Sequence, residues 1–128
     1  MIDGNLAAGL PPEPGRRDDF PAVAARLADP SVRGIIVGTP VYMGGITALG
    51  KAFLDRWSVF RAEGYTLRNK VGACLAVGGS RNGGQELAVV SVLVAMTYQE
   101  MVLVGDGDPG YHFGATLLND GKADVLGD

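Results

Sequence analysis

The sequence has a single cysteine and a single histidine among its 128 residues. One cysteine cannot form a disulfide within the chain, and no Cys/His spacing matches a zinc site or a metal cluster. No apolar run approaches the ~20 residues that span a bilayer, and no basic stretch followed by an apolar one opens the chain. We therefore expect no metal centre, no membrane partner and a cytoplasmic location.

An excess of positive charge is also absent. Eleven Lys and Arg residues face fourteen Asp and Glu residues, which gives a net charge of −3 and no reason to expect nucleic acid as a partner. At 128 residues and 47% hydrophobic content, the chain is long enough for one core. We expect a single domain over residues 1–128, with a Pro-rich, irregular segment over 1–17.

Three short apolar runs predict buried β-strands at residues 34–38, 71–77 and 101–105. Their residues are apolar in succession rather than in alternation, which is typical of a parallel sheet covered on both faces. Helical patterns fill the intervals between them. This alternation predicts an α/β fold.

The expected helices have recognisable starts. Asp18 or Asp19 can cap the first, and Thr47 can cap the second. The third, over about 86–99, is rich in valine and depends on burial more than on helix propensity. Three residues of the second helix recur at every fourth position and should face the sheet: Leu49, Phe53 and Trp57.

The loop after the first predicted strand suits a flat ligand. Pro40 fixes φ and lacks an amide proton, while Gly44 and Gly45 allow the backbone to approach a planar group closely. Tyr42 and Met43 add an aromatic and a polarizable surface. Ligands of open α/β sheets bind at the C-terminal ends of strands, so this loop is a candidate site for a heteroaromatic ring.

A second glycine-rich loop, residues 78–86 (Gly-Gly-Ser-Arg-Asn-Gly-Gly-Gln-Glu), follows the next predicted strand and opens a helix at Gln85 or Glu86. Together with the segment 34–45, it resembles the flavin-ring loops of the flavodoxin-like, NAD(P)H-dependent FMN reductases. The second loop is most similar to that of the iron-sulfur flavoprotein branch. The resemblance runs from about residue 18 to 118, and it includes helix positions of the family's pattern at Lys51, Leu54, Asp55 and Arg56.

This resemblance implies a flavodoxin-like, doubly wound parallel sheet in the order 2-1-3-4-5. It also implies an oxidoreductase that passes electrons from NAD(P)H, a transient donor, through FMN to a quinone, a flavin or another small acceptor. The flavin carries the chemistry, so no catalytic side chain is expected. The implied cofactor-binding residues are Thr39, Pro40, Val41, Tyr42, Met43, Gly44, Gly78, Gly79, Arg81, Asn82, Gly83, Gly84, Gln85 and His112.

The chain departs from the family's pattern at both ends. Nothing matches the first strand, the phosphate loop or the first helix, and the last helix has no convincing counterpart. We therefore expect weak FMN binding, with a non-catalytic remnant or interaction domain as the alternative function. Residues 10–17 lack the cysteines of the iron-sulfur branch, so no iron–sulfur cluster is expected.

Without those helices one apolar face of the sheet should be bare, and the strand 34–38 should have an unpaired edge. Monomers seldom tolerate exposed apolar patches beyond a few hundred Å2. We therefore expect a homo-oligomer, a dimer or higher, that covers this face or pairs this edge.

Several residues also have a purely structural interpretation. Lys51, Asp55 and Arg56 can form helix-stabilising pairs, and Cys74 is expected to be a small buried hydrophobe. For Arg81 and Asn82, solvated turn residues remain the alternative to ligand contacts. For His112, the alternative is a loop residue held by backbone hydrogen bonds.

Overall fold

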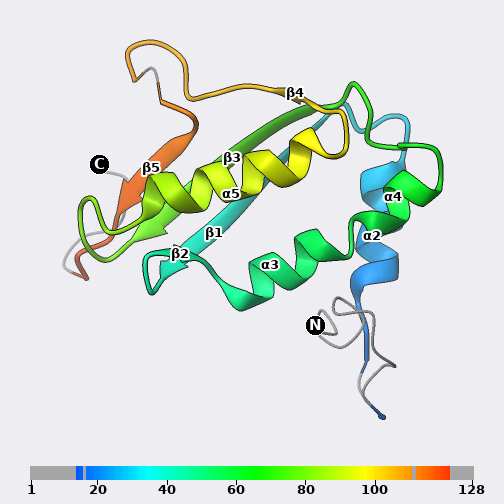
Figure 1. The fold of residues 1–128 in the computed structure, drawn as a ribbon, viewed down its shortest axis with the longest axis horizontal. Coiled ribbons are helices and arrows are strands. Elements are labelled where there is room, and N and C mark those ends of the chain that lie inside the picture. The colour runs from blue at the N-terminus through cyan, green and yellow to red at the C-terminus, as the bar shows by residue number, and fades with distance from the viewer. Residues whose placement is uncertain (1–13, 16, 111, 122–128) are drawn as a thin grey trace.

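The computed structural model describes residues 14–15, 17–110 and 112–121, so the Pro-rich segment 1–17 lies almost wholly outside the described residues. Helical and strand segments follow one another along the chain, as the sequence predicts, with two strands or two helices in succession at three places (Figure 1). In chain order the elements are α2 (Phe20–Ala28), β1 (Gly34–Tyr42), β2 (Gly45–Ile46), α3 (Ala48–Asp55), α4 (Ser58–Ala62), β3 (Val71–Gly78), α5 (Gln85–Thr97), β4 (Val102–Leu103) and β5 (Ala115–Leu118).

The sheet is built around β3. Strand β1 runs parallel to one edge of β3 over seven residue pairs, and the short β2 turns back antiparallel to the end of β1. On the other edge of β3, β4 pairs with its first two residues and β5 with its last four, both in parallel. The two short strands therefore follow one interrupted line. The predicted strand 101–105 is shorter than expected, and β5 was missed because a loop separates it from β4.

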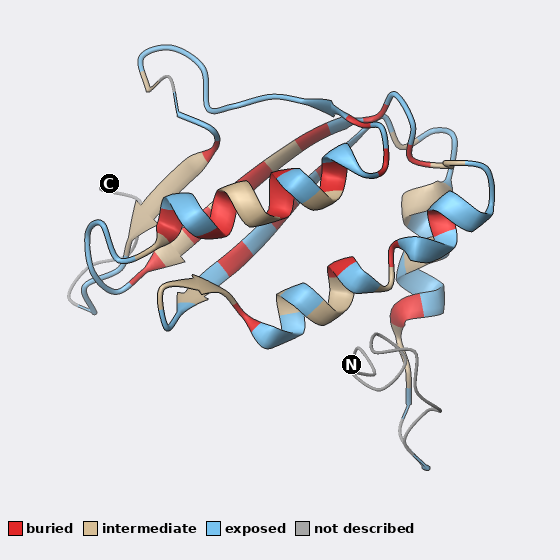
Figure 2. Ribbon diagram, viewed as in Figure 1, coloured by how far each residue is buried: buried red, intermediate tan, exposed pale blue. Residues whose placement is uncertain are grey.

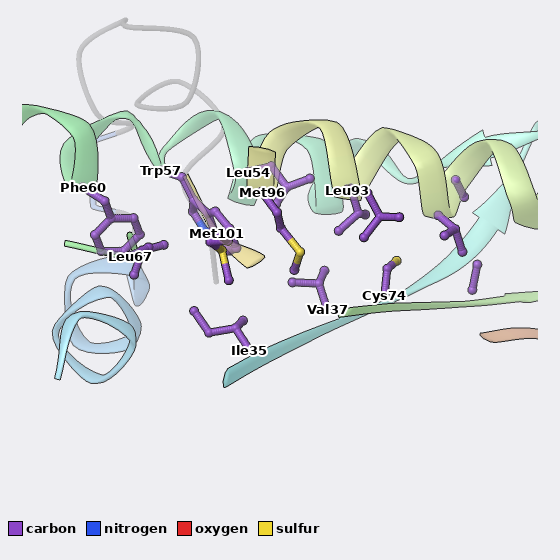
Figure 3. Close-up of a cluster of buried hydrophobic side chains, with 14 of the residues drawn as sticks. Ile35, Val37, Leu54, Trp57, Phe60, Leu67, Cys74, Leu93, Met96 and Met101 are labelled. Carbon is purple, nitrogen blue, oxygen red and sulfur yellow. The ribbon is translucent and has the colours of Figure 1, made fainter. Parts of the chain in front are cut away.

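The core lies between the sheet and one layer of helices (Figure 3). Trp57 is buried in it, with its ring 5.5 Å from that of Phe53 and 6.1 Å from that of Phe60. The second helix was predicted to run through Trp57, but α3 ends at Asp55, and α4, which was not predicted, begins at Ser58. Leu49 was predicted to face the sheet but is exposed, because α3 turns only its later residues, such as Leu54, into the core.

Thr47 caps α3 as predicted, since its hydroxyl accepts a hydrogen bond from the amide of Gly50 at 3.0 Å. Helix α2 begins after Asp19, where the Asp18 carboxylate accepts a bond from the amide of Phe20 at 3.2 Å. Asp18 also pairs with Arg56 at 2.6 Å, and this ion pair is largely shielded from solvent. The sequence placed Arg56 in a helix-stabilising pair, and the structure shows that the pair joins two helices.

The described helices cover only one face of the sheet (Figure 2). Along β1, Ile35 and Val37 are buried, whereas Ile36 between them is 71% exposed. Val71 and Val102 are exposed on the neighbouring strands. The apolar succession along the strands therefore predicted the parallel sheet, while burial alternates because no described element lies against the second face.

Candidate functional site

The first glycine-rich loop is a β-hairpin rather than an irregular loop. Strand β1 continues through Pro40 to Tyr42, and Tyr42 pairs with Gly45 of β2. Met43 and Gly44 form the two-residue turn with φ values of 51° and 81°, the left-handed geometry that joins tightly paired strands. The expected boundary at residue 38 was wrong. In the described structure β2 pairs with the outer edge of β1 only at Val41 and Tyr42, so Pro40 lies at an unpaired position of that edge, where a strand tolerates proline.

The hairpin presents two of its side chains to solvent. Tyr42 is 67% exposed and Met43 is fully exposed at the turn. Thr39 differs, because its side chain is buried and its hydroxyl donates to the carbonyl oxygen of Pro40 at 2.8 Å. Of these predicted residues, Tyr42 and Met43 offer side chains to a ligand, and Thr39 can offer only its backbone.

The second loop is held together by Gln85. The side-chain oxygen of Gln85 accepts a hydrogen bond from the amide of Gly83 at 2.8 Å, and its Nε2 donates to the carbonyl of Ser80 at 2.7 Å. Gly78 lies under this side chain, and a Cβ at Gly78 would approach Nε2 to 2.5 Å. Gln85 is buried, so its amide shapes the loop, while Arg81 and Asn82 are exposed on the loop's surface.

The two loops touch at their glycines. Gly84 adopts a φ of 113°, and a Cβ built on it would overlap the carbonyl of Gly44 in the hairpin turn. Both loops follow parallel neighbouring strands, so this contact lies at the C-terminal edge of the sheet. Strand order predicts that residues 39–45 and 78–86 converge on one pocket. The two loops do touch, but the cavity next to them is lined by the second loop and not by residues 39–45.

A cavity of about 910 Å3 opens beside the second loop. Its walls are the 81–86 segment and the loop between β4 and β5, and β5 lines it as well. The hairpin residues 39–45 are outside its lining. The structure thus brings the predicted residues together in two adjoining groups: the hairpin, and a cavity wall that contains Arg81, Asn82, Gly84, Gln85 and His112.

His112 is fixed by an aspartate that the sequence analysis missed. The Nδ1 atom of His112 lies 2.7 Å from Asp106 Oδ2, and the amide of His112 donates to Oδ1 of the same carboxylate at 2.7 Å. Two hydrogen bonds hold the pKa of Asp106 below its ordinary value. The bond with the His112 side chain has the larger effect, and the bond from the His112 amide has the smaller one. An ionised carboxylate accepts only, so Nδ1 carries the proton and Nε2 remains for other contacts.

The structure agrees with the interpretation of His112 as a loop residue held through its backbone, since its amide donates to the Asp106 carboxylate and its carbonyl accepts from the Asp106 amide at 3.4 Å. The ring contact with the same carboxylate adds to these bonds. An aspartate six residues before the only histidine, in a stretch rich in Gly and Asp, was the available signal.

The charges around the cavity bear on which parts of a nucleotide could bind there. Three of its lining residues are acidic, namely Glu86, Asp106 and Asp108, and one, Arg81, is basic. Glu86 occupies the first turn of α5, where a phosphate would otherwise be favoured by the helix N-terminus. The described residues therefore fit a flat, neutral ring far better than a phosphate group.

Other reactive groups do not add to the site. Burial raises the pKa of the Cys74 thiol to about 11, which agrees with its expected role as a buried hydrophobe. Within the described ranges, no three His, Cys, Asp or Glu side chains gather as metal ligands. None of the described helices is long and apolar enough to cross a membrane.

Comparison with known proteins identifies the family. The model of the NADPH-dependent FMN reductase family matches residues 3–115. The chain belongs to this family.

The relatives that the chain resembles include iron-sulfur flavoproteins and proteins named NAD(P)H dehydrogenase (quinone). The chain is 40% identical to an iron-sulfur flavoprotein of Methanocaldococcus jannaschii over 111 residues, which cover 87% of this chain and 56% of the relative. It is 47% identical to an iron-sulfur flavoprotein of Methanosarcina thermophila over 73% of this chain and 48% of the relative. It is 39% identical to NAD(P)H dehydrogenase (quinone) 3 of Rhizobium meliloti over 66% and 38%.

A solved structure supports the flavodoxin-like fold. The WrbA-like flavodoxin protein from Agrobacterium tumefaciens superposes with a TM-score of 0.65 at 24% identity, covering 76% of this chain and 57% of that one. The chain spans about half the length of the curated relatives it matches.

Proposed function

We propose that this domain holds the ring of FMN at the junction of the hairpin and the second loop, as part of an NAD(P)H-dependent oxidoreductase. The observation that carries the proposal is the Gly44–Gly84 contact at the C-terminal edge of the sheet, with Tyr42 and Met43 exposed beside it. Family membership supports the cofactor and the donor. Relatives named NAD(P)H dehydrogenase (quinone) favour a quinone among the small acceptors.

In this proposal the backbone amides of residues 41–45 bind the polar edge of the ring, and Tyr42 and Met43 contact its flat surface. FMN, when bound, supplies hydride and electron transfer, and the protein supplies orientation and electrostatics. Asp106 keeps the proton of His112 on Nδ1, so Nε2 can accept a hydrogen bond from a molecule in the adjoining cavity.

Phosphate binding by the described residues should be weak, because carboxylates outnumber the guanidinium around the cavity. A cluster is not part of the proposal, although relatives carry iron-sulfur names, because the sequence has one cysteine and it is buried in mid-strand. We therefore expect FMN to be retained weakly by the described residues.

Flavin titration tests this function directly. We expect quenching of flavin fluorescence on binding, with FMN and riboflavin differing by less than about tenfold in affinity. Tyr42→Ala should weaken ring binding by roughly tenfold, the order expected for one lost aromatic contact. Leu49→Ala, at an exposed apolar residue of α3, is the control and should leave flavin binding unchanged.

NADH and NADPH oxidation with a benzoquinone acceptor then tests electron transfer by the flavin-loaded protein. A protein that stays colourless after titration with both flavins would overturn the proposal and favour the non-catalytic interaction domain. Strong preference for FMN over riboflavin would instead mean that a phosphate site exists outside the residues discussed above.

A further inference from the structure

A small hollow opens from the cavity beside the second loop. Its volume is about 220 Å3, and it shares three lining residues with the larger cavity, namely Glu86, His112 and Thr116. It lies where the first half of α5 packs beside β5 (Figure 1). This volume is below the range of pockets for drug-sized ligands, so it admits a single ring rather than a fused ring system. The hairpin residues 39–45 do not line it, so the hollow is separate from the proposed flavin position.

The apolar walls of the hollow suit an aromatic ring. Val89 of α5 is buried, whereas Phe113 is 68% exposed and presents an aromatic surface that a ligand could cover. A Cβ on Gly114 would lie 2.4 Å from the carbonyl oxygen of Cys74 and 3.0 Å from Cγ1 of Val89. The backbone at Gly114 therefore packs directly against β3 and α5, and the fold sets the shape of these walls without a ligand.

Two polar groups of the hollow accept hydrogen bonds only, and the third, the Thr116 hydroxyl, can donate or accept. The carboxylate of Glu86 is one acceptor. The other is Nε2 of His112, because the Asp106 carboxylate, 2.7 Å from Nδ1, holds the ring proton on Nδ1. A ring with acceptors only, such as a quinone or an aryl ether, would place acceptor against acceptor and leave these groups unpaired. A ring that fits the hollow must therefore carry an O–H or N–H donor.

The charge around the hollow disfavours anions. The described residues that line the two cavities carry three carboxylates, on Glu86, Asp106 and Asp108, and one guanidinium, on Arg81. Placing a like charge beside carboxylates is unfavourable. The ring should therefore be uncharged as well as rich in donors.

From this combination we propose that the hollow is a second ligand site, which binds one neutral aromatic ring whose hydroxyl group donates a hydrogen bond to Nε2 of His112. Phenols are the chemical class with these properties. Asp106 is a positioning residue, since it acts through the tautomer of His112. Phenol binding here requires no flavin, so it can be measured, and can fail, independently of the proposed function.

Binding to the flavin-free protein tests the site. In an NMR titration at about pH 8, we expect phenol to bind with a dissociation constant on the order of 1 mM, in keeping with its few non-hydrogen atoms. Anisole is the matched probe, because its methyl ether has no donor, and it should bind at least about tenfold more weakly. Equal binding of phenol and anisole, or tighter binding of the anion benzoate than of phenol, would overturn the proposal. Failure of phenol to bind at about tenfold higher concentration would do the same.

The single histidine of the chain shows where the phenol binds. In 15N NMR spectra, phenol should shift the Nε2 resonance of His112 much more than the Nδ1 resonance, because only Nε2 accepts the new hydrogen bond. This measurement uses the wild-type protein, so it does not depend on the folding of a variant. If phenol binds and the Nε2 resonance does not move, the phenol lies elsewhere and the proposal is wrong.

Asp106→Asn tests the positioning role. In the wild type, Oδ1 of Asp106 accepts from the His112 amide and Oδ2 contacts Nδ1. An asparagine that keeps the first bond directs its NH2 group at Nδ1, so Nδ1 must accept and the ring proton moves to Nε2. The preference for phenol over anisole should then fall to about twofold or less, because Nε2 becomes a donor.

Asp55→Asn is the matched control, since it makes the same change at an exposed aspartate of α3 and should keep the wild-type preference. Circular dichroism shows whether each variant remains folded. A folded Asp106→Asn protein that keeps the wild-type preference for phenol would overturn the role of Asp106.

Discussion

The two glycine-rich loops use their glycines differently. In the hairpin, a Cβ at Gly44 or Gly45 would meet nothing within 4 Å, so glycine is needed only where φ is positive, at Gly44. In the second loop, Gly78 and Gly84 each lie against another group that a Cβ would strike. The first loop is thus open to a ligand. The second loop is closely packed, and its shape depends on glycine at Gly78 and Gly84.

Gly84→Ala should have the largest effect, because it adds both a steric overlap with the Gly44 carbonyl and strain at a φ of 113°. We expect a loss of about 3 kcal/mol in the free energy of unfolding, measured by urea denaturation. Gly79→Ala is the control, since the nearest atom to its Cβ would be the Asn119 oxygen at 3.8 Å. If both variants lose the same free energy of unfolding, the close packing at Gly84 does not matter for stability.

Gln85→Leu should cost about 2 kcal/mol, because the Gly83 amide and the Ser80 carbonyl both lose their partner. Gln85→Glu is a graded control, since a carboxylate still accepts from Gly83 but cannot donate to Ser80. We expect its stability to fall between those of the wild type and the leucine variant. A leucine variant as stable as the wild type would mean that Gln85 does not hold the loop.

Gly44→Ala should cost about 1 kcal/mol, since its φ of 81° disfavours a side chain but the space around it is open. Thermal unfolding of this variant beside Gly45→Ala, where φ is not positive, isolates the conformational part. A loss as large as that of Gly84→Ala would show that the hairpin turn is packed in the same way as the second loop.

The smallest effect concerns the other cavity wall. Because the pKa of Asp106 is lowered from 3.8, its contact with His112 contributes stability above that ordinary value and loses it as pH falls through the lower, folded value. Asp106→Asn should therefore flatten the dependence of stability on pH below about pH 4, with little change in the packed loop. An unchanged acid limb would mean that the pair contributes nothing to folding.

Strand order allowed the convergence of the loops to be predicted from sequence, because parallel neighbouring strands end at the same edge of the sheet. The hairpin was missed because Pro40 usually marks the end of a strand, and only the structure shows that the outer side of β1 makes no ladder there. Trp57 was expected to continue a helix, but α3 ends at Asp55 and Trp57 precedes α4, with its ring against that of Phe60.

The Asp106 contact could not be read from spacing alone, because it depends on how the loop between β4 and β5 closes. The amide of Asp106 approaches the carbonyl of His112 at 3.4 Å, so the loop returns to nearly the point where it left the strand line. No periodic pattern encodes such a closure. The same is true of the cavity, which exists only because this loop and the second glycine-rich loop enclose it.

The loop between β4 and β5 can change in sequence without a change in the register of the sheet. Both strands are fixed to β3, one at each end, so the segment between them begins and ends at points that the sheet determines. Residues 107–110 can therefore be lengthened, shortened or exchanged without shifting the register of any strand. One wall of the cavity can therefore change in length and sequence, while the sheet and the contact between the hairpin and the second loop stay the same.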